Sequence, residues 1–478
     1  MAKDALPKQS EDFPAWYQEV VKRSGMAEHG LPKGSMVMKP HGYAVWEHLQ
    51  RALDDRFKAT GHENLLFPML IPKSLLDKEK GHFEGFSPEL AIVTIGGGEV
   101  LEEPLVIRPT SEAVIWPTYG KWMQSYRDLP FLYNQWCNVL RWEMRTRLFL
   151  RTSEFIWQEG HTAHATAGEA KEEVARMLDV YREVAEDVLA IPVLTGRKTP
   201  SETFPGAVYT LAIEGLMRDG KALQSGTSHF LGQNFSKVYD CQFLNKDGEQ
   251  EYAYGTSWGF STRMVGGTIM AHGDDRGLKL PPAVAPVQVV VVPIYKNDDE
   301  RAKVLEVAAK IKTALAGDLI RVKVDDRDQH RPGYKFSEWE LKGVPLRIEV
   351  GPRDVDSDQV VIASRFNGNK ESRSTSEAIA SIAGLLDQMQ KDLYADALTF
   401  REANTHKIEN YDSFVEGISA ESGLWVGAWC GDEACEQKAI ADAKASIRVV
   451  PLEQEDPGAG CAVCGRPGTE RATWAKSY

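Results

Sequence analysis

The sequence has little cysteine and no long apolar run. Six cysteines in 478 residues are too few for the disulfide scaffold of a small secreted domain. No stretch offers the roughly 18 uninterrupted apolar residues that a membrane-spanning helix needs. The N-terminal segment MAKDALPKQSEDF also lacks the apolar core of a signal peptide. These absences predict a cytoplasmic protein that makes no contact with membranes.

The sequence also has fewer basic than acidic residues. The 56 basic residues are outnumbered by 69 acidic ones, which gives a formal net charge of −13. This balance excludes a protein that binds nucleic acid through bulk positive charge, so a polyanionic partner must meet local basic patches. The hydrophobic fraction of 42% is that of a globular protein. The length suggests about three domains.

Arginines and aromatic residues are nevertheless concentrated in residues 138–164, which read NVLRWEMRTRLFLRTSEFIWQEGHTAH. Residues 141–143 alternate like a strand, and Phe155, Trp157 and Glu159 repeat the same period of two. Because side chains alternate between the two faces of a strand, the pattern predicts a hairpin with one charged and aromatic face.

The chemistry of this hairpin has two interpretations. An arginine next to a carboxylate, as in Arg141 and Glu143, by itself favours a structural ion pair. However, Arg151 stands four residues before Phe155, which brings a guanidinium suited to phosphate oxygens close to a ring suited to a nucleobase. We therefore interpret the hairpin as a nucleotide site. Arg263, in SWGFSTRMVGG, adds a second cation, although such a glycine-containing turn more often leads into a packed helix.

Periodicity and composition predict further elements along the chain. Apolar residues recur at helical spacing in residues 43–57 and 174–188, which predicts two amphipathic helices. Residues 61–72 read as a turn followed by a strand, and GGGEV at 96–100 is typical of a hairpin tip. The proline-rich segment 280–288 predicts a linker.

A different pattern follows the linker. After the apolar strand VQVVVVPI, predicted strands at 319–324, 345–351 and 359–364 alternate with predicted helices at 298–315 and 376–394. This alternation predicts a small α/β domain with a largely parallel sheet. We expect three domains, with residues 1–283, 284–398 and 399–478.

The cysteines are clustered near the C-terminal end. The spacing is C-x4-C followed, after a gap, by C-x2-C, in Cys430, Cys435, Cys461 and Cys464. Four thiolates at such spacing suit a tetrahedral zinc ion, and a closed shell of four ligands predicts a structural rather than a catalytic site. The alternatives are reduced thiols without a metal, or an iron–sulfur site. Cys137 and Cys241 lack such partners and are expected in the core.

Several motifs together resemble the class II aminoacyl-tRNA synthetases. They are Pro68 closing GHENLLFP, Arg141-x-Glu143, Arg151-x-x-x-Phe155, and Gly259 through Arg263. The segments RPTSE at 108–112, FIWQEGHTAHAT at 155–166 and QSGTSHFLGQNFSKVYD at 224–240 are similar to those of the prolyl-tRNA synthetases, in particular the archaeal and eukaryote-like type. The resemblance extends over the full chain.

The resemblance implies a fold and a function. We expect a multidomain α/β and α+β protein with an antiparallel-sheet catalytic domain, an α/β anticodon-binding domain and a small zinc-binding C-terminal domain. Such enzymes activate L-proline with ATP to prolyl-adenylate and pyrophosphate, and then transfer proline to the 3′ end of tRNA(Pro). They are homodimers and use magnesium with ATP. Alternatives are another class II synthetase, for threonine, histidine or glycine, or a catalytically silent RNA-binding paralogue.

The resemblance also implies roles for individual residues. Arg141, Glu143 and Arg263 match catalytic positions. The positions that match ATP-binding residues are Arg141, Glu143, Arg151, Thr152, Phe155, Gln224, Thr227 and Arg263. The positions that match the proline pocket are Phe86, Thr110, Glu112, Arg141, Trp157, Glu159, His229 and Ser261.

Two further consequences concern tRNA. Glu340, Arg347 and Arg353 are expected to read the anticodon, because arginine pairs bidentately with guanine. The alternative for each of them is a solvated strand edge. The bacterial members carry an editing insertion between the second and third motifs, for which this sequence has no room, so we expect no editing domain.

Overall fold

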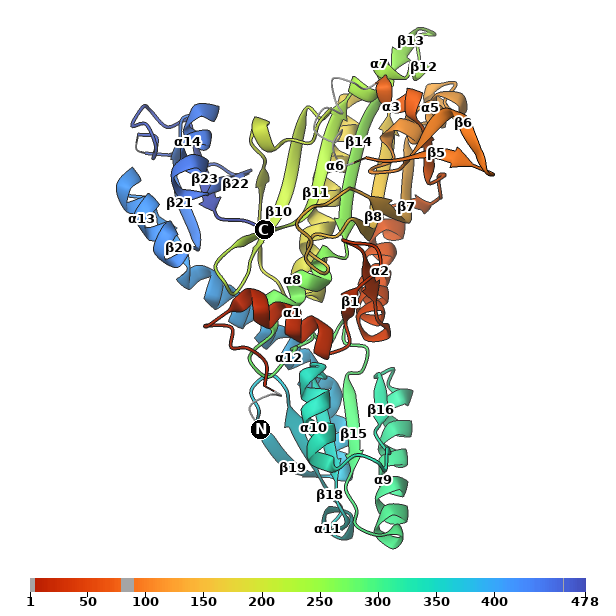
Figure 1. Ribbon diagram of the computed structural model, residues 1–478, viewed down its shortest axis with the longest axis vertical. Helices are drawn as coiled ribbons and strands as arrows, with labels where there is room; N and C mark the ends of the chain where they lie inside the picture. The colour runs from red at the N-terminus through yellow and green to blue at the C-terminus, as the bar shows by residue number, and fades with distance from the viewer. Residues whose placement is uncertain (1–4, 79–89, 459) are drawn as a thin grey trace.

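The computed structural model describes residues 5–78, 90–458 and 460–478 (Figure 1). An 11-stranded sheet contains strands from residues 63–261 and 405–475. In spatial order its strands are β20 (Thr405–Lys407), β21 (Leu424–Trp429), β23 (Glu470–Ala475), β22 (Ser446–Pro451), β9 (Val193–Arg197), β10 (Tyr209–Leu216), β11 (Ala222–Gly232), β14 (Tyr254–Ser261), β8 (Glu154–His164), β7 (Phe131–Leu140) and β3 (Glu63–Asn64).

The middle of this sheet, from β9 to β7, is antiparallel throughout. Four helices contribute to the core beside it: α1 (Phe13–Arg23), α2 (Pro40–Ala59), α6 (Ala167–Glu183) and α8 (Arg263–His272). The helices predicted from the apolar spacing are confirmed as α2 and α6, the second followed by a π-helical turn, Val184–Val188. α6 begins with a capping box formed by Thr166 and Glu169 and packs on β11 and β14.

The predicted hairpin in residues 138–164 is confirmed, with one correction. β7 and β8 pair in antiparallel register, with Leu140 opposite Glu154. However, β7 ends at Leu140, so residues 141–143 do not alternate as a strand. One bond in the same register follows, from the Arg141 N–H to the Ser153 carbonyl at 2.8 Å, and the strand pairing goes no further.

A smaller sheet meets the C-terminal end of β7, where the Leu140 N–H donates to the Arg108 carbonyl at 3.0 Å. It has the order β4 (Leu70–Pro72), β6 (Glu99–Ile107), β5 (Ala91–Gly96). The predicted hairpin tip is confirmed at Gly97 and Gly98, whose positive φ angles of 64° and 90° suit glycine. The predicted strand in residues 61–72 is shorter than expected. The neighbouring helices are α3 (Lys73–Asp77) and α5 (Glu112–Trp122), and smaller elements nearby are η2 (Tyr126–Asp128), α7 (Asn234–Val238), β12 (Gln242–Leu244) and β13 (Gln250–Tyr252).

The α/β unit follows residues 280–288, which contain no helix or strand. Its five-stranded sheet has the order β16 (Val322–Val324), β15 (Val289–Pro293), β17 (Leu346–Val350), β18 (Gln359–Ser364), β19 (Lys370–Ser374), with α9 (Asp298–Gly317), α10 (Pro332–Leu341), α11 (Pro352–Asp356) and α12 (Thr375–Ala403). The prediction of a largely parallel sheet was wrong. Only β16, β15 and β17 are parallel, while β18 and β19 pair antiparallel, because a short connection joins successive antiparallel strands.

The C-terminal part adds α13 (Tyr411–Glu421) and α14 (Glu433–Ala443) to strands β20 to β23. These strands are continuous with the rest of the 11-stranded sheet, because β22 pairs with β9 at Val450 opposite Arg197. Figure 1 shows this part beside strands β10, β11 and β14, and the sheet of the α/β unit beyond α12. Near the N-terminus, β1 (Ala27–His29) and β2 (Met36–Met38) form a short hairpin. Among the described residues, no helix has the length and apolar character needed to span a bilayer.

Candidate active site

A cavity of about 460 Å³ opens over strands β8, β10, β11 and β14. Most of the residues predicted for ATP and proline line it together: Thr110, Glu112, Arg141, Phe155, Trp157, Glu159, Gln224, Thr227, His229, Ser261 and Arg263. Glu143, Arg151 and Thr152 do not line it, and Phe86 lies outside the described residues. The antiparallel register accounts for the convergence, since it sets Trp157 opposite Ser261 and Thr227 opposite Gly259.

Arg141 lies over the aromatic floor of the cavity. Its guanidinium carbon is 5.5 Å from the ring centre of Phe155 and 5.4 Å from that of Trp157. Its Nε donates to the Pro109 carbonyl at 3.0 Å. A Cβ at Gly259 would lie 3.2 Å from the Trp157 ring, so glycine at this position lets the ring lie against the neighbouring strand. These contacts fix a cation above two rings.

Arg263 is the first residue of α8, and its Nε donates to the Leu150 carbonyl at 3.2 Å. Burial, together with the positive charges of Arg141 and Arg151, lowers the pKa of its guanidinium to about 10. Unlike Arg263, Arg151 is largely exposed and forms an ion pair with Glu143 at 3.0 Å. The ion pair expected in the hairpin therefore joins Glu143 to Arg151. Arg141 and Arg263, which both line the cavity, make this end suited to a phosphorylated ligand.

A buried network of carboxylates forms the opposite part of the cavity. Thr110 donates to Glu112 at 2.5 Å, and Gln135 donates to Glu159 at 2.6 Å. Ser111 also donates to Glu159. Each of these polar side chains is at most 3% exposed. Such complete pairing is what keeps charged groups stable away from water.

Sequence reasoning missed His161 as a member of this network. Its Nε2 lies 3.0 Å from the Glu159 carboxylate. Burial alone would lower the pKa of His161, but the charges of Glu112 and Glu159 and the hydrogen bond raise it. For Glu159, burial opposes ionisation, but the hydrogen bond and charge of His161 lower its pKa. The signal was present in the sequence, because His161 follows Glu159 by two residues on the same strand face.

His229 stays neutral at the cavity wall. Its Nδ1 is 2.8 Å from the Thr210 hydroxyl, and its ring lies 4.7 Å from that of Phe204. Burial, with smaller contributions from the charges of His161 and Arg141, lowers the pKa of His229 to about 3. A neutral imidazole adds no repulsion toward a cationic substrate.

Comparison with known proteins decides the family. The proline–tRNA ligase of Chlorobium phaeobacteroides (strain BS1) is 50% identical over 484 residues, covering 99% of this chain and 100% of that protein. The proline–tRNA ligase of Chloroflexus aurantiacus (strain ATCC 29366) is 51% identical and covers 100% of both. The chain belongs to the prolyl-tRNA synthetase family. A crystal structure of prolyl-tRNA synthetase from Cryptosporidium parvum, complexed with halofuginone and AMPPNP, is similar with a TM-score of 0.94 and 37% identity, covering 99% of each chain.

Three family models match successive parts of the chain, and all three agree with this family. Residues 98–272 match the tRNA synthetase class II core domain (G, H, P, S and T), residues 288–385 match the anticodon binding domain, and residues 411–478 match the prolyl-tRNA synthetase C-terminal domain. The multidomain class II synthetase fold expected from the sequence is thereby confirmed.

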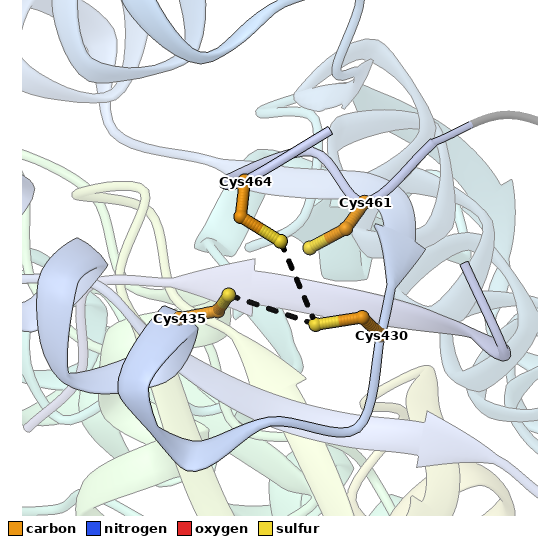
Figure 2. A group of neighbouring side chains, drawn as sticks. All are labelled: Cys430, Cys435, Cys461 and Cys464. Carbon is orange, nitrogen blue, oxygen red and sulfur yellow. Dashed lines mark hydrogen bonds between the residues drawn. The ribbon is translucent and has the colours of Figure 1, made fainter. Parts of the chain in front are cut away.

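The four C-terminal cysteines of this synthetase converge as predicted. Figure 2 shows their side chains pointing toward one another, and the Sγ atom of Cys430 lies 3.6 Å from that of Cys435 and 3.8 Å from that of Cys464. Four sulfurs held about 2.3 Å from a tetrahedral zinc ion would lie about 3.8 Å apart, so this geometry fits zinc. Cys137 and Cys241 are buried, as expected.

A charged side chain borders the cysteine cluster. The Nε of Arg466 donates to the Cys464 sulfur at 3.3 Å, and its Nη2 donates to Cys430 at 3.6 Å. This contact lowers the pKa of the Cys464 thiol to about 6, which favours the thiolate that binds metal. Among the described residues, one other group brings ligand-type atoms within 4.8 Å of one another, namely Glu112, Glu159 and His161, but its atoms are already hydrogen-bonded to each other and to neighbours.

Two of the three predicted anticodon residues lie together. Glu340 and Arg347 line one cavity of about 140 Å³ in the α/β unit, whereas Arg353 does not line it. The Arg347 guanidinium lies 4.2 Å from the ring centre of Phe336. Glu340 is in α10, not on a strand, so the strand-edge alternative is wrong for this residue. Sequence reasoning missed α10 because the surrounding charges hid its apolar face.

Proposed function

We propose that the chain is a proline–tRNA ligase, which activates L-proline with ATP to prolyl-adenylate and then transfers proline to the 3′ end of tRNA(Pro). The observation that carries this proposal is the single cavity that holds arginines and aromatic rings at one end and buried carboxylates at the other. ATP enters as its magnesium complex, and the two ends suit its phosphates and the amino acid respectively.

Arg141 is proposed to bind the α-phosphate while Phe155 and Arg263 enclose the adenine. An oxygen of the proline carboxylate attacks the α-phosphorus, the new P–O bond forms, and the bond to the bridging oxygen breaks to release pyrophosphate. No covalent enzyme intermediate is required, so positioning and charge neutralisation supply the catalysis. Further nucleotide contacts are proposed for Glu143, Arg151, Thr152, Gln224 and Thr227.

The carboxylate end of the cavity is proposed to bind proline. Glu112 would pair with the secondary ammonium group, and Trp157 would contact the apolar ring. Glu159, held by Gln135 and His161, would contribute the negative charge of the pocket floor. The remaining proposed contacts are Phe86, Thr110, Arg141, His229 and Ser261.

A structural zinc ion is proposed at Cys430, Cys435, Cys461 and Cys464, since their sulfur spacing matches a tetrahedral site. With four thiolate ligands the ion would have no free position for chemistry. Zinc would join the end of β21, the start of α14 and the loop at 461–464, and thereby stabilise the C-terminal unit.

The protein is proposed to be a homodimer that works in the cytoplasm. Exposed apolar side chains lie at Leu66, Met69 and Leu70 and on the β5–β6 hairpin at Ile95 and Val100, which are 41 to 78% exposed. Leu70 belongs to the same three-stranded sheet as the hairpin, and we term these five residues the apolar edge. Several exposed apolar side chains in one region support a protein interface.

The domain division 1–283, 284–398 and 399–478 assigns the anticodon to the second domain. We propose that Glu340, Arg347 and Arg353 take part in reading it, with Arg347 donating to guanine edges. Residues 144–258, between Glu143 and Gly259, form β8, α6, the strands β9 to β13, α7 and part of β14. This arrangement supports a synthetase with no editing domain between its second and third motifs.

ATP–pyrophosphate exchange with a panel of amino acids tests the proposal. Proline should support exchange, and threonine, histidine and glycine should not. Exchange with one of those three instead would assign the chain to a sister synthetase. Exchange with none of the four would favour a catalytically silent RNA-binding paralogue.

A further inference from the structure

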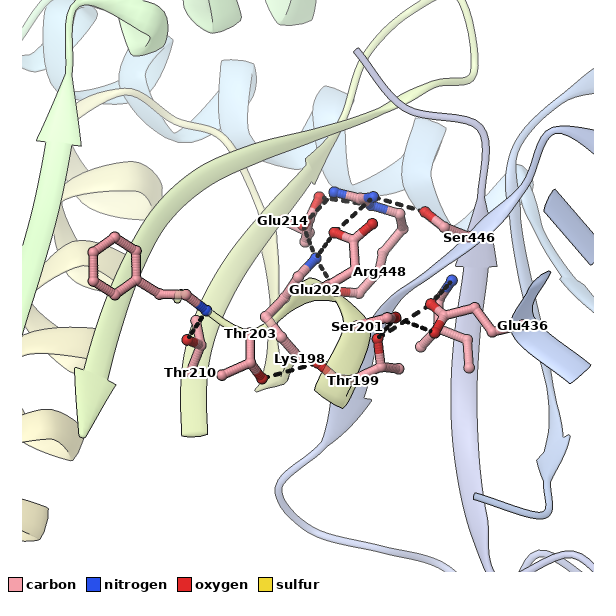
Figure 3. Close-up of polar contacts among 12 residues, drawn as sticks. Lys198, Thr199, Ser201, Glu202, Thr203, Thr210, Glu214, Glu436, Ser446 and Arg448 are labelled. Carbon is pink, nitrogen blue, oxygen red and sulfur yellow. Dashed lines mark hydrogen bonds and ion pairs between the residues drawn. The ribbon is translucent and has the colours of Figure 1, made fainter. Parts of the chain in front are cut away.

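A buried polar network joins the C-terminal unit to one wall of the substrate cavity (Figure 3). The wall is the segment of residues 199–205, which includes the short 3-10 helix η4 (Pro200–Glu202). We call this segment the wall loop, and its residues 201–205 line the cavity. On the other side of the network, α14 and β22 of the C-terminal unit contribute Glu436 and Arg448.

The cationic half of the network is fully paired. Arg448 donates to both carboxylate oxygens of Glu214, at 2.9 and 3.3 Å. Lys198 donates to the Arg448 carbonyl at 3.0 Å and forms an ion pair with Glu202 at 3.2 Å. Lys198, Glu214 and Arg448 are each at most 5% exposed. Because unpaired buried charges are costly, these contacts fix how the C-terminal unit docks on β9 and β10.

Glu436 makes the direct contact with the wall loop. Its carboxylate accepts from the Ser201 hydroxyl at 2.7 Å and from the Thr199 hydroxyl at 3.2 Å. Glu436 is 1% exposed, so its carboxylate is shielded from water, although Ser201 is exposed at the cavity. Two hydroxyl groups on one 3-10 turn are therefore held by a single carboxylate from a distant part of the sequence.

Further hydrogen bonds connect the wall loop to side chains of the cavity. The Thr203 hydroxyl donates to the Thr199 carbonyl at 2.9 Å, and the Phe204 N–H donates to Thr210 at 3.0 Å. The same Thr210 hydroxyl contacts His229, whose ring lies 4.7 Å from that of Phe204. A continuous set of hydrogen bonds and ring contacts thus leads from Glu436 to the wall beside the proposed proline pocket.

We propose that Glu436 is a positioning residue for the amino-acid substrate, acting from the C-terminal unit through Ser201 and Thr199 on Phe204 and His229. This inference rests on the proposed ligase function. Glu436 follows Cys435 directly in α14, so the proposed zinc cluster and the cavity wall are held by neighbouring residues of one helix. The C-terminal unit thereby contributes to substrate binding without touching the substrate.

The test is the steady-state kinetics of proline-dependent pyrophosphate exchange in the full-length protein. Glu436→Ala should raise the KM for proline about tenfold, the order expected for losing a buried hydrogen bond to a charged group. The KM for ATP and the bound zinc should not change. Glu436→Gln should recover part of the loss, because its amide oxygen still accepts from Ser201.

Two further variants separate positioning from folding. Ser201→Ala removes the same contact from the cavity side and leaves α14 unaltered, so it should also raise the KM for proline. The double variant Ser201→Ala with Glu436→Ala should raise the KM for proline by less than the product of the two single increases, because both changes remove the same interaction. Glu433→Gln changes an exposed residue of the same helix and should behave as wild type.

An unchanged KM for proline in both Glu436→Ala and Ser201→Ala would overturn the proposal. So would a fall in kcat at constant KM that follows a loss of bound zinc, since that result describes a merely structural residue. A wild-type protein that shows no proline-dependent exchange would instead overturn the proposed function, and this inference with it.

Discussion

Burial and neighbouring charges shift the pKa values of individual charged side chains in the cavity. Arg141 and Arg263 are close enough for the charge of Arg141 to lower the pKa of Arg263, whereas Glu112 and Glu159 bring negative charge to the other end of the cavity. A site that concentrates positive charge in this way is prepared for an anionic ligand before it binds. The proposed ATP site therefore depends on single side chains more than on the general charge of the protein.

Arg141→Ala should lower proline-dependent pyrophosphate exchange by on the order of 10³-fold or more, as when an arginine that stabilises a phosphoryl transition state is lost. The thermal unfolding temperature and the bound zinc should stay close to wild type. Arg127→Ala, at an exposed position in η2, serves as the control and should retain full activity. A loss of less than tenfold in Arg141→Ala would contradict the proposed α-phosphate contact.

The buried His272 should contribute to acid sensitivity. Burial lowers its pKa from 6.5 to about 4, so the unfolded chain binds a proton that the folded chain does not. Above pH 6.5 His272 is neutral in both states, so its burial does not lower the free energy of unfolding. As the pH falls from 6.5 toward 4, the free energy of unfolding decreases by about 1.4 kcal/mol per pH unit for one proton. Scanning calorimetry between pH 7.5 and 4.5 should show a smaller fall in unfolding temperature for His272→Gln than for wild type.

The exposed His29 provides the matched control for this measurement. His29→Gln should follow the wild-type pH dependence. Equal falls in unfolding temperature for wild type and His272→Gln would show that the neutral state of His272 does not contribute to stability.

At the scale of elements, the sequence predicted those with a strong apolar period. α2 and α6 each bury one face in the main core, and their spacing was clear. β19, with the sequence KESRS, is mostly exposed and has no apolar alternation, so it was missed. α12 extends to Ala403, past its predicted end at 394, because no glycine or proline ends it there. β7 ends at Leu140, before the alternation of residues 141–143, and no local pattern indicates that end.

The cysteine cluster is an element-scale prediction that metal analysis can test. Purified protein should contain about one zinc ion per chain, as a four-thiolate site requires. Cys461→Ser should lose most of it and lower the unfolding temperature of the C-terminal unit, because the ion joins three otherwise separate segments. Cys241→Ser, at a buried cysteine outside the cluster, should keep the zinc. A folded wild-type protein without zinc or iron would leave the cluster as plain thiols.

At the scale of the whole molecule, contacts between distant segments were beyond the reach of sequence patterns. The motifs predicted which residue types meet in the cavity, but not that Ser111, Gln135 and His161 complete the carboxylate network. The joining of β22 to β9 depends on complementary edges rather than on periodicity. The sheet of the α/β unit was misjudged for a similar reason, since alternation of elements does not determine strand direction.

The apolar edge gives a prediction about assembly. Leu66→Glu together with Val100→Glu places two charges at positions that are 72 and 78% exposed, so the isolated chain should still fold. Sedimentation should show a dimer for wild type and a monomer for the double variant, because charge is strongly disfavoured in an apolar interface. Leu452→Glu, an exposed site in the C-terminal part, is the control. A double variant that remains dimeric would locate the interface elsewhere.

Charging of tRNA tests the central claim most directly. Purified protein, ATP, magnesium, radiolabelled proline and a tRNA(Pro) transcript are combined, and acid-precipitable label is counted. Proline should become esterified to this transcript, and less to one with an altered anticodon. The yield should fall with added salt, since phosphate contacts are screened. A protein that leaves tRNA(Pro) uncharged with proline under these conditions would contradict its assignment as a proline–tRNA ligase.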